Sequence, residues 1–141
     1  MSPQLRDDMI QHAEVEYPRE CCGVLVGVRS RGRLEVRYLR QCANVASDPK
    51  RTYSIATRDL IEAQREARQH GSEIVGFYHS HPNHSAGFSP TDIEQAYWPD
   101  CTYVVIATGP ETQTEIRAYA FTGMSERERR IKPVAVRVTG A

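Results

Sequence analysis

Apolar runs and alternating apolar and polar positions predict a set of β-strands. Residues 21–28 are apolar and rich in β-branched side chains, which is typical of a buried strand. Leu34, Val36 and Tyr38 alternate with charged residues, so they predict a half-exposed strand that pairs with the first in a hairpin. Residues 73–81 place apolar side chains on both faces, which predicts a central strand. Further strands are expected at 51–55, 101–108, 114–121 and 131–138.

Helical spacing of apolar residues and capping signals predict three helices among these strands. Apolar positions behind the N-cap residue Ser2 predict a first helix that ends before Pro18. Thr57 is expected to cap a second helix, which stops at Gly71. A third, short helix is expected over residues 89–97, opened by Ser-Pro-Thr-Asp.

The order of these elements predicts one α/β domain over residues 1–141, with a mixed sheet flanked by helices. A chain of this length can bury a substantial core. Its 18 basic residues balance 18 acidic residues, so the overall charge favours neither nucleic acid nor an anionic membrane as a partner. No apolar run approaches the roughly 20 residues of a membrane span, and the start lacks the layout of a signal peptide. We therefore expect a cytoplasmic protein.

The cysteines do not form a pattern typical of a structural zinc site. None of them stands in a C-x-x-C pair, which argues against a zinc finger or zinc ribbon. We interpret them as buried thiols in a reducing compartment, with a catalytic cysteine as the alternative. The residues concerned are Cys21, Cys22, Cys42 and Cys101.

Two histidines at the end of the predicted central strand suggest a metal site. His79 and His81 are separated by one residue, so they project from the same face, with Cα atoms roughly 6.5 Å apart. That spacing lets both rings reach one ion at about 2.0–2.1 Å. Asp92, in the first turn of the following helix, can supply an oxygen. Three protein ligands leave the fourth zinc position for water, which is typical of a catalytic site.

The same residues also have a purely structural interpretation. An H-x-H pair alone is weak evidence for a metal, and Ser89 followed by Asp92 resembles a capping box that serves only the helix N-terminus. Spacing alone leaves both interpretations open. The other histidines are not expected to be ligands, because His12 lies on the apolar stripe of the first helix, and His70 and His84 are expected in exposed loops.

The order of these residues resembles the signature of the JAMM/MPN+ zinc metalloprotease family. That signature has a distant glutamate, then H-S-H-P, then S-x-x-D, and here these are Glu20, residues 79–82, Ser89 and Asp92. The surrounding segments 14–27, 76–78 and 103–107 resemble the family as well, so nearly the whole chain is covered. The resemblance implies an MPN/JAB-like fold, which is similar to that of cytidine deaminases.

The resemblance also implies a role for each motif residue. His79, His81 and Asp92 would bind Zn²⁺. Glu20 would be the general base toward the attacking water and then the general acid toward the leaving amine, and Ser89 would help to stabilise the oxyanion. The choice of Glu20 among the glutamates rests on the resemblance alone.

The short connections between elements resemble the compact prokaryotic members of the family. Members that cleave ubiquitin chains carry insertions that have no counterpart here. The resemblance therefore implies a peptidase or isopeptidase that acts after the C-terminal Gly-Gly of a ubiquitin-like sulfur-carrier protein. The chain begins almost at its first predicted helix, whereas relatives usually have a strand before it, so we expect that strand to be missing or trimmed.

Two other functions are alternatives to this enzyme. The first is a catalytically inactive MPN-like scaffold, although inactive relatives usually lack part of the ligand set that is complete here. The second is a nucleobase deaminase, which would require H-x-E with P-C-x-x-C, and the cysteines do not supply that pattern.

Arginines gather on the predicted hairpin, where they form either a solvated face or a docking surface for an acidic carrier protein. They are Arg29, Arg31, Arg33, Arg37 and Arg40.

Overall fold

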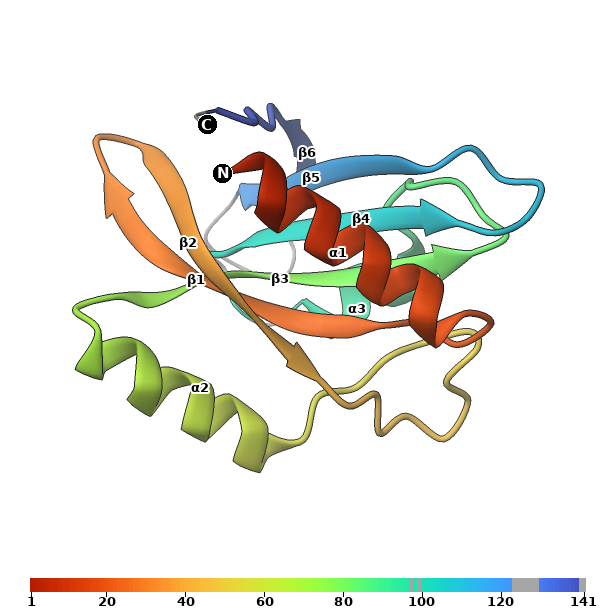
Figure 1. Cartoon of the computed structure of the whole chain (residues 1–141), viewed down its shortest axis with the longest axis horizontal. Coiled ribbons are helices and arrows are strands. Elements are labelled where there is room, and N and C mark those ends of the chain that lie inside the picture. The colour runs from red at the N-terminus through yellow and green to blue at the C-terminus, as the bar shows by residue number, and fades with distance from the viewer. Residues whose placement is uncertain (97, 99, 123–129, 140–141) are drawn as a thin grey trace.

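A six-stranded mixed sheet forms the centre of the molecule (Figure 1). The computed structural model describes residues 1–96, 98, 100–122 and 130–139. Strand order is β2-β1-β3-β4-β5-β6; β3 and β4 pair in parallel and all other neighbours pair antiparallel. The bounds are β1 Cys22–Ser30, β2 Arg33–Cys42, β3 Glu73–Pro82, β4 Thr102–Thr108, β5 Glu115–Thr122 and β6 Arg130–Val134. The predicted α/β class, the hairpin and the central position of β3 are confirmed.

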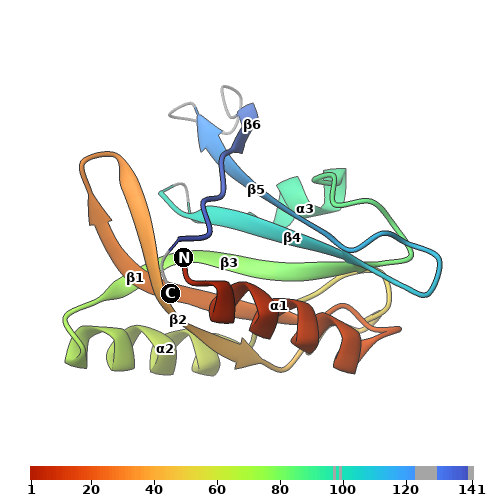
Figure 2. The same cartoon turned by 45° about the horizontal axis from the view of Figure 1, so that its top comes forward.

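Helices cover the two faces of this sheet (Figures 1 and 2). Helix α1 (Pro3–Glu16) buries Met9 and Ala13 against one face, while α2 (Thr57–Gln69) buries Ala63 and Ala67 against the other. The short helix α3 (Pro90–Gln95) lies at the end of β3 that carries the histidines. The structure describes no helix that is both long enough and apolar enough to cross a membrane.

The ends of the helices follow the capping signals, with one exception. The hydroxyl of Ser2 accepts the backbone N–H of Leu5, and α1 ends before Pro18 as predicted. Thr57, the expected cap of α2, is instead the first helical residue; the N-cap is Ala56, with no side-chain capping bond. Helix α3 ends at Gln95, earlier than expected, and Tyr97 lies outside the described residues.

Two predicted strands differ from the structure. Residues 51–55 pair with no strand in the described part of the chain; this segment is a loop that sends Tyr53 into the core. The predicted strand 131–138 is shortened to β6. Its second half leaves the sheet because its backbone bonds to the N-terminus: the amino group of Met1 donates to the Arg137 carbonyl, and Thr139 N–H donates to the Met1 carbonyl (Figure 2).

Candidate metal centre

The histidines of the H-x-H motif lie near the end of the central strand β3. The side chains of His79 and His81 point to the same face, and their Nε2 atoms are 3.2 Å apart. Both residues are buried, with exposed fractions of 0% and 8%. Ser80, between them, uses its Oγ to accept the backbone N–H of Cys21 at 2.7 Å. This bond joins the histidine segment to the start of β1.

The third side chain reaches the same point from helix α3. The Oγ atom of Ser89 accepts the backbone N–H of Asp92 at 3.0 Å, and Oδ2 of Asp92 accepts the backbone N–H of Ser89 at 2.9 Å. This capping box holds the carboxylate with Oδ1 3.0 Å from His79 Nε2 and Oδ2 3.0 Å from His81 Nε2. The structural interpretation and the metal-site interpretation of Asp92 are therefore compatible, because the same carboxylate caps helix α3 and lies beside both histidines.

The chemistry of these three groups fits a cation. The carbonyl of Ser85 lies 2.9 Å from Nδ1 of His81 and can only accept, so Nδ1 carries a hydrogen. In the neutral ring, Nε2 then presents a lone pair to the carboxylate of Asp92. Lone pairs of nitrogen and carboxylate oxygen repel unless a proton or a metal ion lies between them. The ligand atoms of the three side chains lie 3.0–3.2 Å apart. This is close to the roughly 3.3 Å expected between two ligand atoms that each lie 2.0–2.1 Å from a tetrahedral metal ion. The cluster of His79, His81 and Asp92 can therefore hold a metal.

Burial and mutual contacts perturb the ionisation of all three groups. Burial opposes the charge on Asp92, but hydrogen bonds from His79 and His81 outweigh it and hold the pKa of this carboxyl well below its usual range. Burial lowers the pKa of His79. Burial also acts to lower the pKa of His81, but its bonds to Asp92 and the Ser85 carbonyl raise it overall. Without a metal, these shifts leave the carboxylate ionised and His79 neutral, and they favour a proton on Nε2 of His81 that is donated to Asp92. A metal ion bound to Nε2 would take the place of this proton.

Glu20 brings a second carboxyl group close to this cluster. It lies two residues before β1, has an exposed fraction of 4%, and its buried Oε1 has no hydrogen-bond partner in the described part of the chain. Burial raises its pKa to about 8, the positive charge of His81 opposes that rise, and the charges of Asp92 and Asp48 add to it. A buried carboxyl group with a pKa near neutrality is suited to proton transfer.

Ser89 keeps a hydroxyl hydrogen available beside the cluster. Its Oγ is an acceptor in the capping box, and the hydroxyl makes no donated hydrogen bond among the described residues. The hydrogen can therefore be donated to a bound molecule.

Aromatic side chains form one wall of the site, and sequence reasoning missed them. The ring of Tyr53 stacks on His79 with centroids 4.5 Å apart and planes 20° apart, and Phe88 meets His79 edge-on at 6.3 Å. A cavity of about 200 Å³ continues from Tyr53 toward Phe77 and Trp98. Helix α2 separates Tyr53 from His79 in the sequence, so no local pattern could have predicted their stacking.

The remaining histidines and the cysteines lie elsewhere. His12 lies on the buried face of α1, where its Nδ1 is 2.8 Å from the hydroxyl of Tyr78. His70 and His84 are exposed, as expected. All four cysteines are free and buried, as expected. Burial raises the pKa of every cysteine thiol, that of Cys42 and Cys101 to about 11, so none is poised as a nucleophile.

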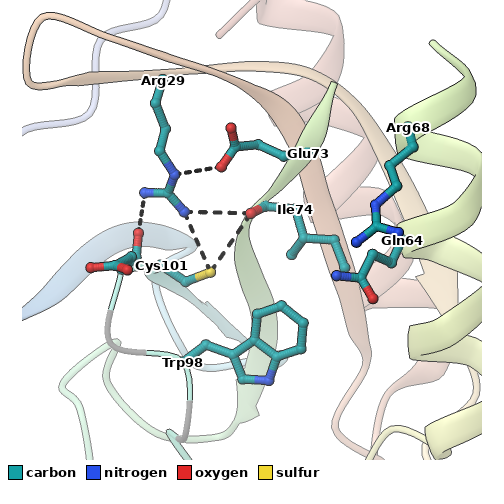
Figure 3. A pocket seen from close by; sticks show the side chains of 8 residues that line it. Arg29, Gln64, Arg68, Glu73, Ile74, Trp98 and Cys101 are labelled. Carbon is teal, nitrogen blue, oxygen red and sulfur yellow. Dashed lines mark hydrogen bonds and ion pairs between the residues drawn. The ribbon is translucent and has the colours of Figure 1, made fainter. Parts of the chain in front are cut away.

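Two of the hairpin arginines are engaged within the protein. Nε of Arg29 donates to Glu73 at 2.7 Å, and its guanidinium also bonds to backbone carbonyls beside a cavity of about 520 Å³ at the opposite end of β3 (Figure 3). Arg40 pairs with Glu62 and Glu66 of α2. The described residues offer no ion pair to the other arginines of the cluster, Arg31, Arg33 and Arg37.

The raised pKa of Glu20 predicts how the stability of the metal-free protein depends on pH. The ordinary pKa of the group is 4.5 and its folded-state pKa is about 8, so between these values the native state holds a proton that the unfolded state releases. The free energy of unfolding therefore falls as pH rises through this window. Glu20→Gln removes the effect, and we expect the variant to be more stable than the wild type by roughly 4–5 kcal/mol at pH 8.5.

Urea denaturation of both chelator-treated proteins from pH 5 to 8.5 measures this difference. Taking the difference between the proteins cancels the titration of groups other than Glu20. Parallel stability profiles would show that folding leaves the pKa of Glu20 unchanged and would contradict this prediction.

Comparison with known proteins gives consistent matches. The desampylase of Haloferax volcanii is 31% identical over 132 residues, 91% of this chain and 91% of that protein. The CysO-cysteine peptidase of Mycobacterium tuberculosis is 32% identical over 111 residues, 79% of this chain and 74% of that protein. A solution structure from Desulfitobacterium hafniense, 22% identical, matches with a TM-score of 0.80 over 98% of this chain and 92% of that chain, which supports the fold alone.

The family described as prokaryotic homologs of the JAB domain matches residues 2–122. This match confirms the resemblance that the order of the motif residues predicted. The chain belongs to the prokaryotic homologues of the JAB domain.

Proposed function

We propose that the protein is a zinc-dependent peptidase or isopeptidase. It hydrolyses the amide bond that follows the C-terminal Gly-Gly of a ubiquitin-like sulfur-carrier protein. The observation that carries this proposal is the buried cluster of His79, His81 and Asp92, whose ligand atoms lie 3.0–3.2 Å apart. The carboxyl of Glu20 is close enough for the charges of His81 and Asp92 to shift its pKa. The complete ligand set makes an inactive scaffold the weaker alternative.

Zinc suits the donor set. Two imidazole nitrogens and a carboxylate oxygen are ligands that zinc takes in hydrolases, and three of them leave one position open. When bound, zinc would lower the pKa of a water molecule and polarise the scissile carbonyl. The bond from Nδ1 of His81 to the carbonyl of Ser85 would fix the orientation of this ligand.

Of the other two motif residues, Glu20 would transfer protons and Ser89 would stabilise the oxyanion. Glu20 would take a proton from the attacking water, since its buried Oε1 has no hydrogen-bond partner in the described residues. It would then return the proton to the leaving amine, which cannot depart as an anion. The hydroxyl of Ser89 would donate to the carbonyl oxygen as negative charge develops there.

The proposed substrate class is supported by the relatives and by the shape of the site. The names desampylase and CysO-cysteine peptidase describe proteins that act on conjugates, and this chain covers most of both. We infer that the aromatic wall of Tyr53 and Phe88, which contacts His79, restricts the side chains that can lie beside the scissile bond. A tail of two glycines would fit this restriction.

A panel of carrier-protein fusions tests the proposal. We expect the zinc-loaded protein to cleave a Gly-Gly-X fusion after the second glycine, as read by mass spectrometry. Chelator treatment should abolish cleavage and added zinc should restore it, because the attacking water depends on the metal.

A fusion in which Ala-Ala replaces Gly-Gly is the matched control and should be cleaved much more slowly. Full cleavage after the metal is removed would contradict the proposed mechanism. A folded protein that never takes up zinc would favour the scaffold.

A further inference from the structure

One asparagine organises the loop between β2 and α2. The side-chain Nδ2 of Asn44 donates to the carbonyls of Glu20 at 3.0 Å, Thr52 at 3.0 Å and Pro49 at 3.3 Å. Its Oδ1 accepts the backbone N–H groups of Ala46 and Ser54, both at 3.1 Å. The two hydrogens of Nδ2 are therefore shared among three carbonyls, of which that of Pro49 is the most distant, and Oδ1 accepts from two backbone N–H groups.

These partners admit only an amide at position 44. Three carbonyls require a donor on one side of the side chain, and two N–H groups require an acceptor on the other. The surroundings thus fix the orientation of the Asn44 amide. Aspartate would place an oxygen against the three carbonyls, and alanine would leave all five groups without this partner.

The bonds of Asn44 hold two segments that each place a side chain at the metal centre. On one side they hold the backbone of Glu20, whose own N–H donates to the Pro49 carbonyl at 2.7 Å. On the other side they hold the residues before and after Tyr53, through the carbonyl of Thr52 and the backbone N–H of Ser54. The ring of Tyr53 stacks on His79.

We propose that Asn44 is a positioning residue that holds Glu20 and the segment carrying Tyr53 as one unit against the metal centre. All five hydrogen bonds of Asn44 go to backbone groups outside the cluster, so it would act through the backbone of Glu20 and of the residues beside Tyr53. The catalytic part of this inference rests on the proposed function, in which Glu20 is the base. The structural part does not depend on it.

Asn44→Ala and Asn44→Asp test the catalytic part. We expect each variant to keep zinc and to lose kcat roughly 10- to 100-fold, with KM within about threefold, because small misplacement of a base is costly to turnover. Ser47→Ala is the control: Ser47 is exposed in the same loop, and we expect the variant to match the wild type. Wild-type kcat in a folded, zinc-loaded Asn44→Ala or Asn44→Asp would overturn the proposal.

Hydrogen exchange tests the structural part without any substrate. In the wild type, we expect the amides of Ala46 and Ser54 to be protected although they lie in a loop. In Asn44→Ala they should exchange at least about tenfold faster, together with the amide of Glu20, while those of α1 are unchanged. Unprotected loop amides in the wild type would overturn the proposal even if neither variant folds.

The two measurements separate failure of this inference from failure of the proposed function. If the wild type cleaves no Gly-Gly fusion, the function fails, and the exchange pattern still decides whether Asn44 joins the two segments. If the wild type cleaves and the exchange of the Ala46, Ser54 and Glu20 amides is the same in Asn44→Ala, the positioning role fails and the function stands.

Discussion

Glu20→Gln is expected to lower kcat by roughly 10²- to 10⁴-fold while the fold and the zinc content are retained. Glutamine preserves the shape of the side chain and can neither accept the proton of the attacking water nor return it to the leaving amine. The carboxyl is buried, and its Oε1 has no hydrogen-bond partner in the described part of the chain, so it is free to take up a proton. Steady-state cleavage of a Gly-Gly-X fusion, with zinc measured in the same sample, gives the result.

Glu14→Gln is the matched control for this loss. Glu14 is an exposed glutamate of α1, and the same change there should leave kcat unaltered. A Glu20→Gln variant with wild-type turnover would show that the base is assigned to the wrong residue. The same variant should be more stable than the wild type without metal, so low activity from unfolding can be recognised.

Asp92→Ala is expected to abolish both metal binding and activity. The change removes the oxygens that lie 3.0 Å from the two histidine nitrogens, and two imidazoles alone hold zinc weakly. It also removes one bond of the capping box, which costs about 1 kcal/mol of stability. We expect a folded protein with no stoichiometric zinc and no cleavage, as measured by metal analysis and by the fusion assay.

Ser89→Ala separates capping from metal binding. It removes the other bond of the capping box and leaves all three proposed ligands in place, so it should retain zinc. If Asp92→Ala still bound one zinc per chain with wild-type affinity, the carboxylate would not be a ligand.

The parts of the site that follow local rules were predictable from the sequence. The period of a strand places His79 and His81 on one face, and the capping pattern places Asp92 at the start of a helix. The meeting of strand and helix depends on the intervening loop, where the Ser85 carbonyl bonds to His81. The resemblance supplied what spacing could not, namely that Glu20 belongs with these residues.

The two strand predictions that failed did so because of partners outside the segments concerned. Residues 51–55 alternate like a strand, but in the structure their backbone bonds to the side chain of Asn44 and Tyr53 packs on His79. The end of the predicted strand 131–138 bonds to Met1 instead of continuing in the sheet. In both cases the decisive partner lies elsewhere in the sequence, so a local pattern carries no information about it.

X-ray absorption at the zinc edge, combined with a metal count, tests the central claim most directly. We predict one zinc per chain, surrounded by nitrogen and oxygen atoms at about 2.0–2.1 Å and with one ligand that exchanges with solvent. A sulfur atom at about 2.3 Å would mean that a cysteine holds the ion. That result, or a fourth ligand from the protein, would contradict a hydrolytic centre built from His79, His81 and Asp92.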